Sequence, residues 1–301
     1  MSAYKGFDKD LRCRGFQYEV GKTYEEKEAR ICETGFHACE NPLNVLQYYP
    51  PCYENRYCEV EQDGDFSEND DSKIASTKIK ISNEISLEEL IQAAMDKTGE
   101  SEFYSVNTCD HTVAENVENC SIALNKGYGS IATNAGHYSL ATTIKDFTIA
   151  ANTGDYSVAC GQSRHSIAAN VGDGSATLSD GYRSIAANTG NCSAAISYGE
   201  DSVAINTGNQ STAINKAIAS VALNIGVRAE ASVTEEGSIA IATGIQSKAK
   251  GALGSAIVLV ERTTWNGYVY PLNNIKAAIV DGEKIKADTW YTLRNGEFVE
   301  V

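Results

Sequence analysis

Residues 166–190, SIAANVGDGSATLSDGYRSIAANTG, contain almost three copies of one nine-residue unit, Ser-Ile-Ala-x-Asn-x-Gly-x-x. Outward from this stretch, the unit recurs without insertion from Thr112 to about Val258. Its first position is Ser or Thr in fifteen of seventeen copies, and its third position is Ala in fifteen, with Thr177 and Val258 as the exceptions. A period this regular is the signature of a repeat architecture.

The turns of the unit set the length of the predicted coil. Gly and Asn tolerate positive φ and permit tight corners, but nine residues are too few to close a coil around an interior. Asn-x-Gly recurs every eighteen residues, at Asn134, Asn152, Asn170, Asn188, Asn206 and Asn224, and the intervening units have looser turns. We therefore predict a mainly β fold, a two-sheeted parallel β-solenoid of 18-residue coils, with about eight coils and a length of roughly 40 Å.

Two interpretations of the strand faces remain open. In the favoured one, aliphatic side chains such as Ile167 fill the interior, since burial of each contributes about 1.5–3 kcal/mol. Ser and Ala would then tile a flat outer face offered to a partner, marked by Ser166, Ser184, Ser202 and Ser220. In the alternative, Ser and Ala fill a very thin roll, and Glu230, Lys248 and Lys250 lie outside.

The flanks of the repeat predict two further parts. Residues 1–110 have the mixed pattern of a small α+β domain, residues 111–258 form the solenoid, and residues 259–301 form a C-terminal β cap. A cap is expected because an open end of a parallel solenoid exposes unpaired strands. Asp281-Gly282 and Asn295-Gly296 predict two-residue hairpin turns within it.

The N-terminal domain shows local signals of strands and helices. Pro42 predicts the start of a short helix, and the alternating segments 55–62 and 73–81 predict strands. Residues 63–71, which include Asp70 and Asp71, read as an acidic loop, and Ser86 precedes a helical pattern that runs to Met95.

Composition excludes several classes of protein. The net charge is −15, and residues 1–111 hold 23 acidic and 12 basic residues, so a basic footprint for nucleic acid is absent. We expect no membrane span, because no apolar run of eighteen residues occurs. The chain has nine cysteines and no apolar N-terminal segment, which favours reduced thiols in the cytoplasm. They are Cys13, Cys32, Cys39, Cys52, Cys58, Cys109, Cys120, Cys160 and Cys192.

Motifs for metals and cofactors are absent from the sequence. Calcium-binding nonapeptide rolls need Asp at one fixed position of the repeat, whereas the Asp residues here fall at different positions. The cysteine spacings around Cys39 lack the paired pattern of a zinc site. His37 lies two residues from Cys39, which is a weak pairing for nucleophilic catalysis. We therefore predict no metal and no cofactor.

The segments AYKGF, GFHACENPLNVLQYY, RYCEVEQ and KIASTKIKI follow one another in an order that distantly resembles small domains of the ADP-ribosyltransferase type. The resemblance implies that Lys5 or Arg14 lies with His37 near a nicotinamide pocket. Glu59 and Glu61 are the nearest candidates for a catalytic Glu. An NAD- or nucleotide-binding N-terminal domain is therefore an alternative function.

The repeat itself is similar to the head repeats of trimeric autotransporter adhesins, which read Asn-Ser-Val-Ala-Ile-Gly with a fourteen-residue period. The whole layout resembles an uncharacterised family found in phages and prophages of gut bacteria. Its features are an opening YKGF…CRGFQYEVGKTY…GFHAC, the central Ser-x-Ala array, and a closing VDGEKIKADTWYTLRNGEFVEV. The resemblance implies expression inside an infected host cell and no particular activity.

These observations favour a non-enzymatic interaction or scaffold protein with a protein partner, either a host protein, such as a defence protein, or a second copy of the chain. The alternatives are the NAD- or nucleotide-binding domain described above and a homo-oligomeric structural protein. We expect neither nucleic acid nor membrane as a partner.

Overall fold

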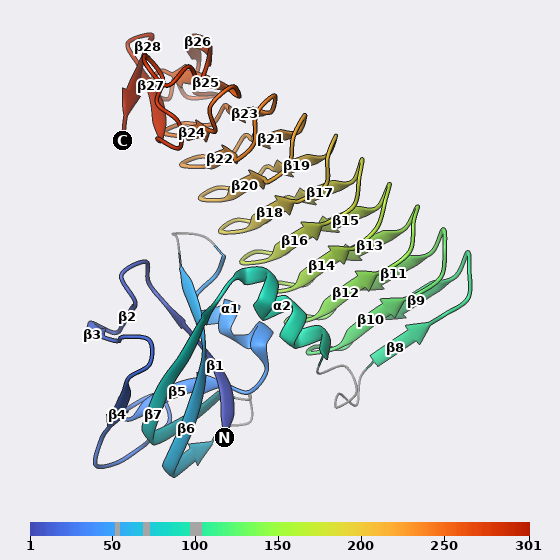
Figure 1. Ribbon diagram of the computed structural model, residues 1–301, viewed down its shortest axis with the longest axis vertical. Helices are drawn as coiled ribbons and strands as arrows, with labels where there is room; N and C mark the ends of the chain where they lie inside the picture. The colour runs from blue at the N-terminus through green and yellow to red at the C-terminus, as the bar shows by residue number, and fades with distance from the viewer. Residues whose placement is uncertain (52–54, 69–72, 97–103) are drawn as a thin grey trace. The chain divides into compact units, whose positions relative to one another are not determined.

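The computed structural model describes residues 1–51, 55–68, 73–96 and 104–301 (Figure 1). The chain forms two compact units, residues 1–101 and 102–301. Cys52, Asp70 and Asp71 lie outside the described residues, so the prediction of an acidic loop is tested only in part. Up to Glu68 the segment is strand rather than loop.

The N-terminal unit is built on a five-stranded antiparallel sheet with the strand order β4-β7-β5-β1-β6. Its elements are β1 (Ser2–Phe7), β2 (Arg12–Cys13), β3 (Phe16–Gln17), β4 (Thr23–Glu25), β5 (Phe36–Cys39), η1 (Pro42–Asn44), α1 (Val45–Tyr48), β6 (Arg56–Glu68), β7 (Lys73–Ile85) and α2 (Leu87–Asp96). Phe7, Phe36 and Ile79 are part of its buried core. The α+β character predicted for this part of the chain is therefore correct.

The local helix signals are also confirmed. Asn41 caps η1 by accepting the Leu43 N–H at 3.0 Å, with Pro42 at the first position. At α2, the Ser86 hydroxyl accepts the Glu89 N–H at 3.2 Å, while the Glu89 carboxylate accepts the Ser86 N–H at 2.7 Å. This reciprocal pair is a capping box, which satisfies two backbone donors that the helix leaves open.

The second unit is a parallel β-solenoid of about nine coils, seen as stacked turns from green to orange in Figure 1. Its strands are β8 (Tyr104–Asn107), β9 (Val113–Asn116), β10 (Ile122–Asn125), β11 (Ile131–Asn134), β12 (Leu140–Thr143), β13 (Ile149–Asn152), β14 (Val158–Gly161), β15 (Ile167–Asn170), β16 (Ala176–Ser179), β17 (Ile185–Asn188), β18 (Ala194–Ser197), β19 (Val203–Asn206), β20 (Thr212–Asn215), β21 (Val221–Asn224), β22 (Glu230–Val233), β23 (Ile239–Ala242), β24 (Lys248–Gly251) and β25 (Ala256–Arg262). Even-numbered strands from β8 to β24 form one sheet and odd-numbered strands from β9 to β25 the other.

The register confirms the predicted 18-residue coil. Ile131 pairs with Ile149 and Ile149 with Ile167, so like residues stack in columns. The solenoid also begins earlier than predicted, because β8 pairs in parallel with β10 and supplies the first strand. Its start at Tyr104 adds a coil to the expected eight and moves the boundary of the N-terminal part ahead of residue 110.

The favoured assignment of the strand faces is wrong, and the alternative is correct. The Ala column, for example Ala150 and Ala168, is fully buried, whereas Ile149 and Ile167 are each 36% exposed. Side chains alternate across a strand, so Leu178 and Ile196 of the other sheet lie on the strand face opposite to Thr177 and Ala195, although both are buried. The two sheets approach too closely for any large side chain between them, which explains the strict Ala by sterics.

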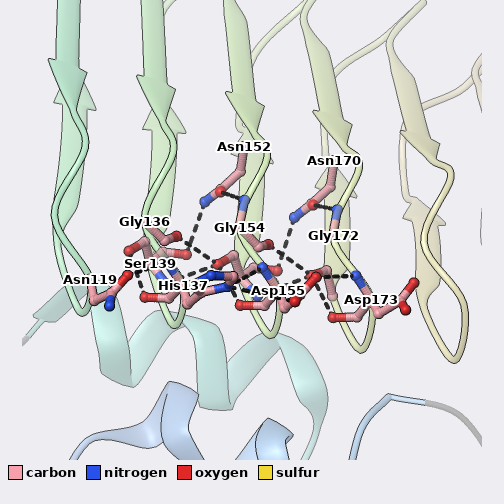
Figure 2. Close-up of polar contacts among 12 residues, drawn as sticks. Asn119, Gly136, His137, Ser139, Asn152, Gly154, Asp155, Asn170, Gly172 and Asp173 are labelled. Atoms are coloured by element: carbon pink, nitrogen blue, oxygen red, sulfur yellow. Dashed lines mark hydrogen bonds and ion pairs between the residues drawn. The ribbon is translucent and has the colours of Figure 1, made fainter.

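Ser and Asn occupy the two corners of the thin interior and satisfy backbone groups there. The amide nitrogen of Asn152 donates to the Ser139 carbonyl at 3.1 Å, and its oxygen accepts the Gly154 N–H at 3.0 Å (Figure 2). The Ser157 hydroxyl accepts the Ser139 N–H at 3.1 Å and donates to a carbonyl oxygen. Buried polar groups need such partners, so the strict Ser and Asn columns have a hydrogen-bonding cause.

A second ladder runs outside the turns. Asn119 accepts the N–H of His137 at 2.9 Å, and His137 Nδ1 accepts the N–H of Asp155 at 2.9 Å (Figure 2). Asp155 then accepts the N–H of Asp173 at 2.8 Å. Each exposed side chain thus bonds the backbone of the following coil, and several residue types, including the imidazole of His137, can provide the acceptor.

The last coil departs from the eighteen-residue register. Ile239 pairs with Ala256 and Ala240 with Ile257, so this coil is one residue short. The inward positions are therefore Ser255 and Ile257, both buried, whereas an uninterrupted period would have placed Ala256 and Val258 in line with the inward Ser and Ala of the other coils. The larger Ile257 fits because it packs into the core of the cap, where it lies with Val280 and Tyr291.

The C-terminal cap ends both sheets with antiparallel strands. Strand β26 (Leu272–Ile279) pairs with β25, and β27 (Tyr291–Arg294) pairs with β24 and with β28 (Glu297–Glu300). Asn295-Gly296 forms the predicted hairpin, with φ values of 52° and 74°. Asp281-Gly282 does not join two paired strands. The Asp281 carboxylate instead accepts the backbone N–H groups of Glu283, Lys284 and Ile285.

Candidate functional site

The N-terminal unit contains a cavity of about 290 Å³. It lies among β1, β5 and α1, with contributions from β2 and the start of β7. Its lining consists of Tyr4, Lys5, Gly6, Cys13, Arg14, His37, Ala38, Cys39, Val45, Tyr48, Tyr49 and Lys73. The lining combines cations, aromatic rings and thiols, and none of its described residues is Asp or Glu.

Lys5 is the most buried cation of the lining, with 5% of its surface exposed. Its Nζ donates to the His37 carbonyl oxygen at 2.6 Å and lies 5.6 Å and 5.5 Å from the ring centres of Phe7 and Tyr18. Burial lowers the pKa of the Lys5 amine, while the nearby Cys13 thiol acts in the opposite direction. In the described part of the chain its contacts are carbonyl, ring and thiol groups, and no carboxylate compensates its charge.

His37 is held in one tautomer by the backbone. Its Nε2 accepts the Cys32 N–H at 2.8 Å, so the proton is on Nδ1, which donates to the Gly35 carbonyl at 3.1 Å. Burial, and then the charges of Lys5 and Lys73, lower the pKa of His37 to about 4. The ring is therefore neutral near pH 7 with both nitrogens engaged, which leaves no free nitrogen for proton abstraction or metal binding.

Arg14 and Lys73 complete the cationic side of the cavity. Arg14 donates to the Cys32 carbonyl at 3.3 Å. Lys73 Nζ lies 3.2 Å from the Cys32 sulfur and 4.6 Å from the centre of the Tyr48 ring. Lys73 reaches the cavity because the first residue of β7 pairs with Cys39 of β5.

Lys5, Arg14 and His37 all line this cavity. That the cavity takes nicotinamide, as the resemblance to ADP-ribosyltransferase domains implies, stays a prediction. Glu59 is not among the lining residues. It lies on β6, where its carboxylate accepts from the Asn83 side chain at 3.3 Å. Tyr49 and Lys73, which line the cavity, were not predicted as site residues. The adjacent tyrosines Tyr48 and Tyr49, at the end of the short helix, were a local signal that could have indicated an aromatic wall.

The serine column does not form an outer face. Ser166, Ser184, Ser202 and Ser220 are each 1% exposed, so the prediction that they present a surface to a partner is wrong. The physical reason is their hydrogen bonding, since hydroxyls such as Ser202 accept a backbone N–H and donate to backbone carbonyls between coils. The side chains that point outward from the odd-numbered strands β11 to β23, which belong to one sheet, are instead mostly aliphatic.

No group of His, Cys, Asp or Glu side chains suited to a metal ion occurs among the described residues. The eight described cysteines form no disulfide with one another, and burial raises the pKa values of Cys58 and Cys160 to about 12, which makes both unreactive near neutral pH. In the described ranges, no helix is long and apolar enough to cross a membrane.

The domain that contains the cavity is also the part of the chain that matches a known family model. Residues 1–93 match a family model described as a domain of unknown function, DUF7666. The chain is thus an N-terminal DUF7666 domain followed by a β-solenoid of about nine turns. No curated protein and no solved structure matches the chain significantly.

Acid should destabilise the DUF7666 domain through His37. The folded-state pKa of about 4 lies below the unfolded value near 6.5, so the unfolded chain binds more protons between these two pH values. Stability is therefore lost as the pH falls through this window. After discounting for solvent screening of the half-buried ring, we expect a loss of about 1–2 kcal/mol from this residue.

Hydrogen exchange of the β1 and β5 amides at pH 7 and pH 4.5, corrected for the intrinsic exchange rates, checks this expectation. In His37→Gln the amide side chain can still donate and accept, so the acid-dependent loss should shrink by that amount. Equal acid dependence in the parent and in His37→Gln would contradict the assignment.

Proposed function

We propose that this protein is a non-enzymatic interaction protein whose solenoid binds a protein partner through the outward aliphatic face of β11–β23. The observation that carries the proposal is the exposure of this face. Its first outward column is formed by Ile131, Ile149, Ile167, Ile185, Val203, Val221 and Ile239, and its second by Thr133, Ala151, Ala169, Ala187, Ile205, Leu223 and Ile241. All are partly exposed, and none is charged.

The size of this aliphatic face favours a reversible interaction. With about 4.8 Å between strands and about 3.3 Å per residue, seven four-residue strands present on the order of 450 Å². Contiguous apolar patches of this size are often functional. Two such surfaces together bury about 900 Å², which is typical of transient complexes rather than of obligate ones.

The chemistry of the face indicates the kind of partner. A flat, uncharged surface gains from contact with another apolar protein surface and offers nothing to a nucleic acid backbone. The resemblance to a phage and prophage family favours a host protein, such as a defence protein, met in the host cytoplasm. The described cysteines form no disulfide with one another, which is compatible with that reducing compartment.

Self-association is the second candidate, and the regularity of the same face favours it. Identical residues recur at each coil, so the face of one copy can meet the face of another through a two-fold axis. The partner would then be a second copy of the chain, and the protein would act as a homo-oligomeric scaffold.

The cavity of the DUF7666 domain supports the non-enzymatic assignment. A transferase of the ADP-ribosyltransferase type would need a catalytic carboxylate at the pocket, and Glu59 and Glu61 are not in the lining. We expect no nicotinamide release when the full-length protein is incubated with NAD. Measured turnover of NAD or another nucleotide would contradict the proposal.

Two substituted chains test the aliphatic face. The double variant Ile167→Lys/Val203→Lys places charges on the face, and Thr189→Lys/Thr207→Lys places the same charges on exposed turn residues that follow β17 and β19. We expect the first pair to weaken partner binding or dimerisation at least tenfold, about 1.4 kcal/mol, and the second pair to leave it unchanged.

Light scattering over a range of concentrations measures self-association, and capture from host lysate on the immobilised parent and variants measures binding to other proteins. A concentration-dependent dimer lost only in the face variant supports the scaffold. A captured protein lost only in that variant supports the host partner. Binding that survives in the face variant, or a monomeric parent that captures nothing, would contradict the role of this face.

A further inference from the structure

We propose that the cavity of the DUF7666 domain is a binding site for a small organic anion, a phosphate ester or carboxylate joined to a planar ring. This inference does not depend on the partner of the solenoid. It rests on the charge, the walls and the size of the cavity, all of which belong to the N-terminal unit.

The charge of the lining points to an anion. Lys5, Arg14 and Lys73 contribute three cationic side chains, while His37 is neutral and its nitrogens are engaged by the backbone. No carboxylate belongs to the described lining, and the contacts of Lys5 are carbonyl, ring and thiol groups. Removing an ammonium group from water is costly unless an opposite charge or strong acceptors surround it. An oxyanion beside Lys5 would supply the missing charge.

The three cations of the lining differ in burial, which gives them different roles toward a ligand. Lys5 lies on a central strand of the domain and is almost fully buried, so it meets the inner end of a ligand. Arg14 is exposed and Lys73 is partly exposed, and both contact Cys32. Arg is suited to paired hydrogen bonds with phosphate or carboxylate oxygens, and Lys provides a compact charge.

The walls favour a planar ring attached to the anion. Tyr4, Tyr48 and Tyr49 line the cavity, and aromatic side chains stack on planar groups. Gly6 fixes one of these walls, because a Cβ at this position would lie 2.6 Å from the side chain of Tyr49. The tyrosine can therefore rest directly against β1 only while residue 6 is glycine.

The size limits the ligand. Small-molecule sites in proteins usually enclose about 300–1,000 Å³, and this cavity of about 290 Å³ lies at the lower end. It suits an aromatic acid or one half of a mononucleotide, and a dinucleotide would extend outside it.

Calorimetric titration of the full-length protein tests the proposal with four probes. Adenosine 5′-monophosphate and benzoate combine a ring with a phosphate or a carboxylate, inorganic phosphate has the charge alone, and adenosine has the ring alone. We expect at least one of the first two probes to bind with millimolar or tighter affinity and at least tenfold more tightly than adenosine. Preference between them identifies the class of anion.

Three substitutions connect binding to the cavity. Arg14→Gln and Lys73→Gln, at the two less buried cations, should each weaken binding of the anionic probe about tenfold, and Lys5→Met should weaken it at least as much. The matched control is Lys9→Gln, an exposed lysine that does not line the cavity, and it should leave the affinity unchanged. Binding of no anionic probe, equal binding of adenosine and its monophosphate, or equal loss in Lys9→Gln would overturn the proposal.

Discussion

Replacing Gly190 with alanine should destabilise the central coils of the solenoid by about 3 kcal/mol or more. A Cβ at this position would lie 1.9 Å from the carbonyl oxygen of Gly172 in the preceding coil. That oxygen belongs to the backbone and cannot rotate away as a side chain can. The two coils would have to separate locally, and the hydrogen bonds between them would be lost.

Hydrogen exchange of the strand amides, measured by mass spectrometry in the full-length chain, locates the effect. Loss of protection should centre on the coils that contain β15, β17 and β19. Thr189→Ala is the matched control, because it changes the neighbouring exposed side chain and leaves the backbone bond from the Thr189 N–H to the Asn170 carbonyl in place. Normal protection in Gly190→Ala would show that the coils do not require this close approach.

Asn188→Ala should cost nearly as much, about 2–4 kcal/mol. The Asn188 side chain is 1% exposed, donates to the Ser175 carbonyl at 3.2 Å and accepts the Gly190 N–H at 3.0 Å. Alanine would leave these buried backbone groups without partners and would add a cavity at the corner of the coil. Chemical denaturation followed by circular dichroism measures the loss in unfolding free energy.

Asn209→Ala provides the comparison for this prediction. Asn209 is exposed, and its side-chain oxygen accepts the Val227 N–H at 2.9 Å on the outside of the turn. Water can replace that acceptor, so a loss of about 1 kcal/mol or less is expected. If both variants lost equal stability, burial of the Asn column would not be the cause of its importance.

Both predictions follow from an interior that has little hydrophobic content. A buried Ala removes much less apolar surface from water than a buried Ile would. Stability of the coils therefore depends on backbone pairing between strands and on the Ser and Asn side chains that satisfy the corners. The aliphatic side chains left on the outside are then available to a partner, which connects the thin interior to the proposed interaction.

The repeat length and the turn residues were enough to predict two strands per coil and parallel stacking. The same pattern did not decide which side chains point inward. Ile and Ala positions alternate along each strand, so either set could face the interior. Hydrophobicity favoured Ile inside, but the close approach of the two sheets, seen at fully buried Ala168, admits only small residues. The outward position of Glu230 and Lys248, which form an ion pair at 2.9 Å, agrees with this arrangement.

Local chain chemistry determined a further set of features: the capping box at Ser86 and Glu89, the hairpin at Asn295-Gly296, and the alternating strands β6 and β7. Each depends on residues close in sequence, so the sequence by itself was sufficient. It failed at the last coil, where one missing residue shifts Ile257 inward. That shift depends on packing against the cap, which a strict period cannot show.

The residues of the cavity also divide into those that were predicted from the sequence and those that only the fold brings together. The resemblance to ADP-ribosyltransferase domains indicated Lys5, Arg14 and His37 as candidates, and the antiparallel pairing of β5 with β7 added Lys73 from a distant segment. The sequence by itself thus determined the coil, its turns and the polar residues that the interior requires, because these follow from backbone geometry repeated along the chain. Tertiary structure alone decided which face is buried, how the last coil ends and which cations share one cavity, because these depend on the distance between segments that only folding brings together.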